Sequence, residues 1–158
     1  MKTINDFIQE KLKLNKDIEV KEYWKPKDKN DLRNALRLRL MINHNANLNN
    51  IDVSEITDMS ILFYELNPYN IDISEWDVSN VKDMSCMFLD CDKFNCDLSK
   101  WDVNKVEIMD NMFAGCEKFS SDLSEWNVKN VKDMYNMFGS CARMTKNIPK
   151  WYKYETNK

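Results

Sequence analysis

Glycine is almost absent from this chain, which has two glycines in 158 residues, three prolines and a single histidine. Two glycines are too few for a Gly-rich phosphate-binding loop, so that class of nucleotide site is excluded. The histidine, His44, lies in the polar stretch NHNANLNN, and no Ser or Cys nucleophile pattern accompanies it. A solvated loop histidine of this kind does not make a catalytic centre, so we expect no enzyme and no cofactor.

Long apolar runs are also absent, since no stretch approaches the roughly 18–20 residues that cross a bilayer. The amphipathic start MKTINDFIQEKLKLNK lacks the apolar region and cleavage site of a secretion signal. The five cysteines are odd in number and form no CxxC pair, which favours reduced thiols, no metal centre and a cytoplasmic location. A surface adhesin is the alternative if a signal peptide has been removed.

The charge divides the chain into two parts. Residues 1–47 hold 11 Lys/Arg and 7 Asp/Glu (net +4), whereas residues 48–158 hold 12 and 19 (net −7). We expect an N-terminal segment with a capping helix over 1–47, and repeats with a C-terminal cap strand over 48–158. Because the repeat body is acidic, direct nucleic-acid binding by that body is not expected.

The dominant feature is a repeat with a period of 25 residues. Trp76, Trp101, Trp126 and Trp151 mark it, and the other apolar positions follow in register. A fixed period in this range predicts stacked repeats that share one core. The expected core residues are the four Trp and the columns Met84, Met109, Met134; Phe88, Phe113, Phe138; and Cys91, Cys116, Cys141.

Within one repeat the apolar spacing changes from two to three and four. Spacing two around Trp101 indicates a strand, and spacing three and four from Val106 to Cys116 indicates a helix. The pattern L-x-x-W-x-V-x-x-V-x-x-M is similar to a leucine-rich repeat. We therefore expect an α/β, leucine-rich-repeat-like solenoid of about four 25-residue strand–helix coils with a helical N-terminal cap.

The phrase DISEWDVSNVKDMSCMFLDCDKFNCDLSKWDV resembles the BspA-like surface-protein repeat family, which occurs in bacteria, mycoplasmas and mobile elements. The match is strongest from Asp52 to about Met144. The resemblance implies protein recognition or adhesion, and it carries no catalytic residues.

The cysteine column could form a thiol ladder, and marginally a disulfide or a soft-metal site. Leu66 fills the same slot in the first repeat, so a small apolar core residue is the preferred interpretation. Cys96 aligns with Ile71 and Ser121, and we expect it near the surface.

Polar residues beside each buried Trp are expected to line a concave face. The candidate partner-binding residues, called the acidic strip below, are Asp52, Glu75, Asp77, Lys100, Asp102, Glu125 and Asn127. Two interpretations stay open: each Asp accepts a backbone hydrogen bond, or the strip awaits a basic protein partner. We expect a non-enzymatic protein–protein interaction module that binds through this strip or the N-terminal segment. The alternative is a phage-type acidic inhibitor that blocks a nucleic-acid-binding host protein.

Overall fold

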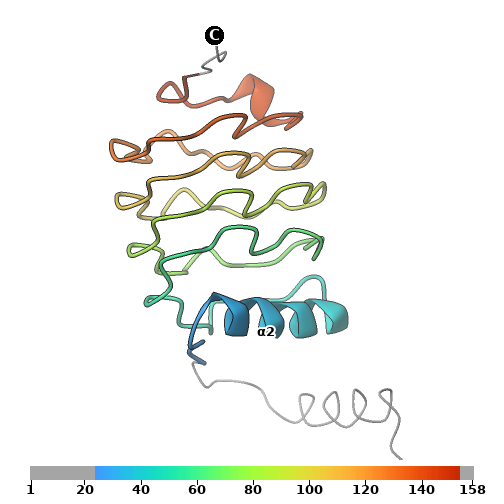
Figure 1. Cartoon of the computed structure of the whole chain (residues 1–158). Coiled ribbons are helices and arrows are strands. Elements are labelled where there is room, and N and C mark those ends of the chain that lie inside the picture. Colours follow the sequence, from blue (N-terminus) through green and yellow to red (C-terminus); the bar gives the residue numbers. More distant parts are fainter. Residues whose placement is uncertain (1–23, 154–158) are drawn as a thin grey trace, which may run out of the picture.

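The computed structural model describes residues 24–153, in which the chain forms one α-helix followed by a stack of coils (Figure 1). The helix is α2 (Lys29–Ile42), and a single 3-10 turn, η1 (Met144–Lys146), lies near the other end. The repeats are numbered here from one to four, over residues 47–71, 72–96, 97–121 and 122–146.

Helix α2 forms where the sequence predicts a helix before the repeats. The Asp28 carboxylate caps its N-terminus by accepting the N–H of Asp31 at 2.9 Å, and Arg39 lies in its last turn. Leu32, Leu36 and Leu40 recur every four residues and are all buried. The helix therefore has one apolar face, which packs on the first repeat.

The expected α/β class is wrong, because the described residues contain no strand, and their repeats contain no α-helix. Neighbouring repeats are joined instead by isolated parallel bridges, which pair residues that are 25 apart from Asp58 to Asp133. Residues 147–153 form no strand, and the rest of the expected C-terminal cap strand lies outside the described residues. The leucine-rich-repeat solenoid of strand–helix coils is therefore replaced by a stack of turns.

The helical half of each repeat fails to form a helix because two of its positions have left-handed backbone. The first position has φ of 52–53° and the second 54–77°, and both recur every 25 residues. A left-handed residue ends an α-helix at once. The eight residues are Ile61, Cys86, Asn111, Asn136 and Glu65, Asp90, Gly115, Ser140.

Backbone N–H groups in this half donate alternately within the repeat and to the next repeat. Met87 donates to the Met84 carbonyl three residues back at 3.2 Å, whereas Cys86 donates to the Asp110 carbonyl at 2.9 Å. Such turns bring every third or fourth side chain inward, as a helix would. The spacing therefore identifies the buried residues correctly although the backbone is not helical.

The core consists of columns of like side chains. Successive Phe rings lie 5.1, 5.5 and 5.8 Å apart and nearly parallel, in the column Phe63, Phe88, Phe113, Phe138. Each repeat Trp donates its indole N–H to a carbonyl 28 residues earlier, as Trp101 does to Ile73 at 3.1 Å. The other three bonds are Trp76 to Leu48, Trp126 to Leu98 and Trp151 to Leu123.

Burial of the expected core residues follows the stack. Within the three columns and the Trp series, all are buried except Met134 and Trp151, which are half-buried. Both exceptions lie at the C-terminal end, where no further described repeat covers them. The core is therefore continuous through the middle repeats and thins at its last layer.

Helix α2 closes the N-terminal end of the stack, across which it lies in Figure 1. The Arg33 guanidinium donates to the carbonyls of Ile61, Leu62 and Tyr64, the last two at 2.8 Å. Lys29 pairs with the Asp58 carboxylate at 2.9 Å. These carbonyls face outward from the first repeat, so the helix supplies the donors that a preceding repeat would otherwise give.

Candidate protein-binding surface

Each repeat turns its corners with the motif Asp-x-Ser or a close variant. In repeat two, Asp72, Asp77 and Asp83 each accept the N–H of the residue two places on, at 3.1, 3.0 and 2.8 Å. This bond defines an Asx turn, which fixes a corner without glycine. The motif therefore explains how a repeat can turn so often with so little glycine.

The acidic strip lies along one series of these corners. Asp77 and Asp102 each use one carboxylate oxygen, Oδ1, to accept a backbone N–H at 3.0 Å. Asn127 occupies the same slot in repeat four and makes the same contact at 3.3 Å. Asp52 is half-buried, whereas Glu75, Asp77, Lys100, Asp102, Glu125 and Asn127 are exposed.

The first interpretation of the aspartates is thus met, since each accepts a backbone hydrogen bond. This bond engages only Oδ1 of Asp77 and Asp102, and both side chains are exposed. An aspartate can therefore hold its corner and still present charge to a partner.

The corner bonds also keep the carboxylates ionised. The Ser79 hydroxyl and N–H lower the pKa of Asp77, and the Ser54 hydroxyl and N–H lower the pKa of Asp52 in the same way. The negative charge of Asp52 acts in the opposite direction and offsets part of the lowering of the Asp77 pKa. Neighbouring carboxylates of the column therefore repel each other.

A second aspartate column borders the strip, and the sequence analysis missed it. Asp72 is half-buried and Asp97 and Asp122 are exposed, each at the corner before the buried Trp. The N–H groups of Ser99 and Ser124 lower the pKa of Asp97 and Asp122 respectively. The signal was present, because the phrase DISEWDVS contains the Asp-x-Ser motif twice.

Close ion pairs form only at one edge of the strip in the described part of the chain. Lys25 neutralises the N-terminal edge, with its Nζ 3.6 Å from Asp52 and 2.9 Å from Glu55. In the part of the chain that the structure describes, neither Asp77 nor Asp102 has an ion-pair partner within 4 Å. Lys105 lies close enough to Asp77 to lower its pKa, and Lys100 belongs to the strip itself, so the two carboxylates have cations nearby but no close ion pair.

The expected concave shape does not follow from this structure. That expectation needed an inner sheet of strands, and no strand is present between residues 24 and 153. The acidic strip lies instead on turn corners at the side of the stack.

The cysteine column is part of the core. All five cysteines are free, and Cys91, Cys116 and Cys141 are buried. The Sγ–H groups of Cys116 and Cys141 donate to the carbonyls of Phe88 and Cys116, each at 2.9 Å. Burial raises the pKa of Cys91 to about 12 and that of Cys141 to about 11, so their reactive thiolate forms are disfavoured.

The expectation for Cys96 is wrong. Its side chain is only 8% exposed, and burial raises its pKa. Ile71 and Ser121, which hold the same slot in the adjacent repeats, are buried too. The cysteine nearest the surface is Cys86, which is half-buried at a left-handed corner.

The described residues were also compared with the requirements of a histidine-based site, a metal site and a membrane span. His44 is exposed in its loop. Over residues 24–153, no three His, Cys, Asp or Glu side chains are gathered closely enough to hold a metal ion. The same range contains no helix with the length and apolarity to cross a membrane.

Comparison with known proteins gives one match. No curated protein and no solved structure matches the chain. A protein family described as "Mycoplasma protein of unknown function, DUF285" matches residues 30–151, from the start of α2 to the last repeat Trp. This range covers more than half of the 158 residues, so the chain belongs to the DUF285 family.

Proposed function

We propose that this protein is a non-enzymatic protein-binding module whose acidic strip recognises a basic surface on another protein. The supporting observation is that the Asp77 and Asp102 carboxylates lie on exposed, hydrogen-bonded corners and form no ion pair within 4 Å in the described part of the chain. A rigid corner lowers the entropy that a charged side chain loses on binding.

The second aspartate column extends this surface. Asp97 and Asp122 stand one corner away from Asp102 and Glu125, so acidic groups lie on both sides of the turn that holds the Trp. Exposed charge of one sign speeds the encounter with a partner of the opposite sign, and salt screens it. We therefore expect the association rate constant to fall as salt rises.

The proposal includes a cytoplasmic location and a BspA-like assignment for the repeats. Five free thiols are compatible with a reducing compartment, which supports action in the cytoplasm. The repeated phrase EWDVSNVKDMSCMF supports a BspA-like assignment within the broader family. That assignment fits a role in protein recognition.

The test replaces charge without breaking the corners. Asp77→Asn with Asp102→Asn removes two charges, and Asn127 shows that asparagine forms this turn. We expect the double variant to fold normally, to bind a fluorescent Lys/Arg-rich peptide several-fold more weakly, and to lose part of the salt dependence. Substitution by lysine would be a poorer test, because lysine cannot accept the N–H of the turn.

A matched control is available in another column. Asp83→Asn with Asp133→Asn removes two charges from the same type of turn, since both residues accept the N–H two places on at 2.8 and 2.9 Å. This control should bind as the unchanged protein does. Equal weakening of both double variants would show that binding follows net charge alone, and the acidic strip would lose its assigned role.

A further inference from the structure

The two ends of the stack differ in how their backbone groups are satisfied. At the N-terminal end, Arg33 of α2 donates to the outward carbonyls of repeat one, and Leu32, Leu36 and Leu40 cover the core. Among the described residues, no helix covers the core or pairs with the outward backbone groups at the C-terminal end. The outward groups there belong to repeat four.

After repeats two and three, a row of four N–H donors meets a row of four carbonyls of the next repeat, and repeat one makes three of these bonds. In repeat three the distances are 2.7, 2.9, 2.9 and 2.8 Å, from Met109, Asn111, Phe113 and Gly115 to Asp133, Tyr135, Met137 and Gly139. Repeat two makes the same four bonds to repeat three. The equivalent donors of repeat four are Met134, Asn136, Phe138 and Ser140, and none has an acceptor in the structure.

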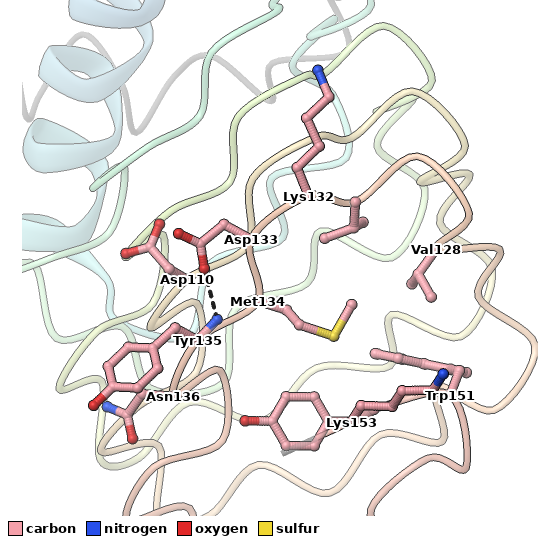
Figure 2. A pocket seen from close by; sticks show the side chains of 11 residues that line it. Asp110, Val128, Lys132, Asp133, Met134, Tyr135, Asn136, Trp151 and Lys153 are labelled. Carbon is pink, nitrogen blue, oxygen red and sulfur yellow. Dashed lines mark hydrogen bonds between the residues drawn. The ribbon is translucent and has the colours of Figure 1, made fainter. Parts of the chain in front are cut away.

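The apolar side chains of repeat four are also less covered than their counterparts. Val103, Val106 and Met109 are at most 2% exposed, whereas Val128, Val131 and Met134 are all half-buried. The three half-buried side chains of repeat four line a hollow of ≈ 610 Å³ together with Trp151 and Tyr152. Figure 2 shows the Met134 side chain directed into this hollow, with Trp151 on its far side.

One residue in repeat four adds to this surface. Tyr135 is 55% exposed and occupies a slot that holds Ser60, Ser85 and Asp110 in the preceding repeats. An exposed tyrosine gives a rigid contact area with a polar tip, which is typical of protein interfaces. Its position beside the unpaired donors places it where a bound segment would pass.

We propose that this C-terminal face binds an extended, repeat-like segment of another protein. The three internal junctions show what fits it: a segment that offers carbonyls at alternate residues and Met and Phe side chains between them. This mode resembles strand addition, in which backbone bonds give affinity and side-chain pockets give specificity. The surface is distinct from the acidic strip, and the proposal does not depend on it.

A second copy of this chain is a poorer occupant. Two C-terminal faces turned toward each other would set N–H groups against N–H groups. The opposite face of a second copy has its carbonyls engaged by Arg33 and its core covered by α2. A segment from a different protein meets neither obstacle.

The proposal is tested with a labelled peptide that has the sequence of residues 105–119, KVEIMDNMFAGCEKF, under reducing conditions. Fluorescence anisotropy should show saturable binding to the full chain. Met134→Asp places a charge on the apolar face and should weaken binding at least tenfold, whereas Asp83→Asn, at a corner of repeat two, should leave it unchanged. A peptide with Met109→Asp and Phe113→Asp should not bind.

Amide hydrogen exchange on the unchanged protein gives a second measurement that needs no variant. The peptide should slow exchange at Met134, Asn136, Phe138 and Ser140. The proposal is overturned by absence of saturation at millimolar peptide, or by protection confined to other residues. It is also overturned if these four amides are already protected in the free protein, because the face would then be covered by its own chain or a second copy.

Discussion

At the scale of single residues, one left-handed corner recurs in every repeat and is filled by residue types that differ in how easily they adopt it. The four residues are Ile61, Cys86, Asn111 and Asn136. All four have φ of 52–53°. Asparagine adopts this conformation with little strain, but a β-branched residue does so rarely. The two asparagines therefore suit the corner, and the isoleucine is held there by the stack around it.

Ile61→Asn should stabilise the protein by about 1 kcal/mol, because it removes a β-branched side chain from a left-handed position. The Ile61 side chain is 46% exposed, so little burial is lost, and the carbonyl that Arg33 contacts is kept. Urea unfolding should show a higher midpoint with an unchanged slope. The reverse change, Asn111→Ile, should lower the midpoint. If the urea midpoints of the two variants were unchanged or shifted in the opposite directions, the left-handed corner would carry no backbone strain.

Residue spacing predicts the buried face well and the backbone poorly. A side chain that returns every third or fourth position faces the core both in a helix and in successive turns, so spacing identified Met84, Met109 and Phe113 but could not separate the two. The left-handed corners could not be predicted from the sequence, because Ile61 and Cys86 are residue types that rarely adopt a positive φ. The error for Cys96 came from treating Ser121 in the same slot as a sign of exposure.

At the scale of the repeat, the Trp is the element that ties one coil to the coil before it. Trp101 is buried, packs against Phe88 with ring centroids 6.5 Å apart and ring planes tilted by 33°, and donates its indole N–H to the Ile73 carbonyl. Trp151 makes the equivalent bond to Leu123 but is only half-buried. The same residue type thus has different packing in the middle and at the end of the stack.

Trp101→Ala should reduce the free energy of unfolding by about 3–5 kcal/mol, as expected for a buried aromatic side chain. Trp151→Ala should cost clearly less, since one side of its ring lacks a covering repeat. Thermal or denaturant unfolding of both variants measures the difference. Equal small losses would contradict a core that is shared between repeats.

The corner motif could have been predicted more fully. Asp-x-Ser is a known turn former, and it occurs at three places in repeat two. Taken together with the scarcity of glycine, it indicates corners built from side-chain bonds. The acidic strip and the second aspartate column are both made of such corners, so a structural role and an exposed charge coincide in the same residues.

At the scale of the whole molecule, the stack has a direction. Each repeat points its N–H row toward the next repeat, α2 closes the end that exposes carbonyls, and repeat four leaves its N–H row open among the described residues. The acidic strip runs along the side, and the open face lies at the end. The two proposed binding surfaces are therefore separate, and they differ in character: one presents charge, and the other presents backbone donors and apolar side chains.

Amide hydrogen exchange of the free protein, resolved by residue, tests most directly whether each repeat completes the one before it. The account predicts slow exchange at Met84, Cys86, Phe88 and Asp90, which donate to repeat three, and fast exchange at Met134, Asn136, Phe138 and Ser140, which lack acceptors. Uniformly slow exchange in both rows would contradict the open end. Uniformly fast exchange in both rows would contradict the backbone bonds that hold the stack together.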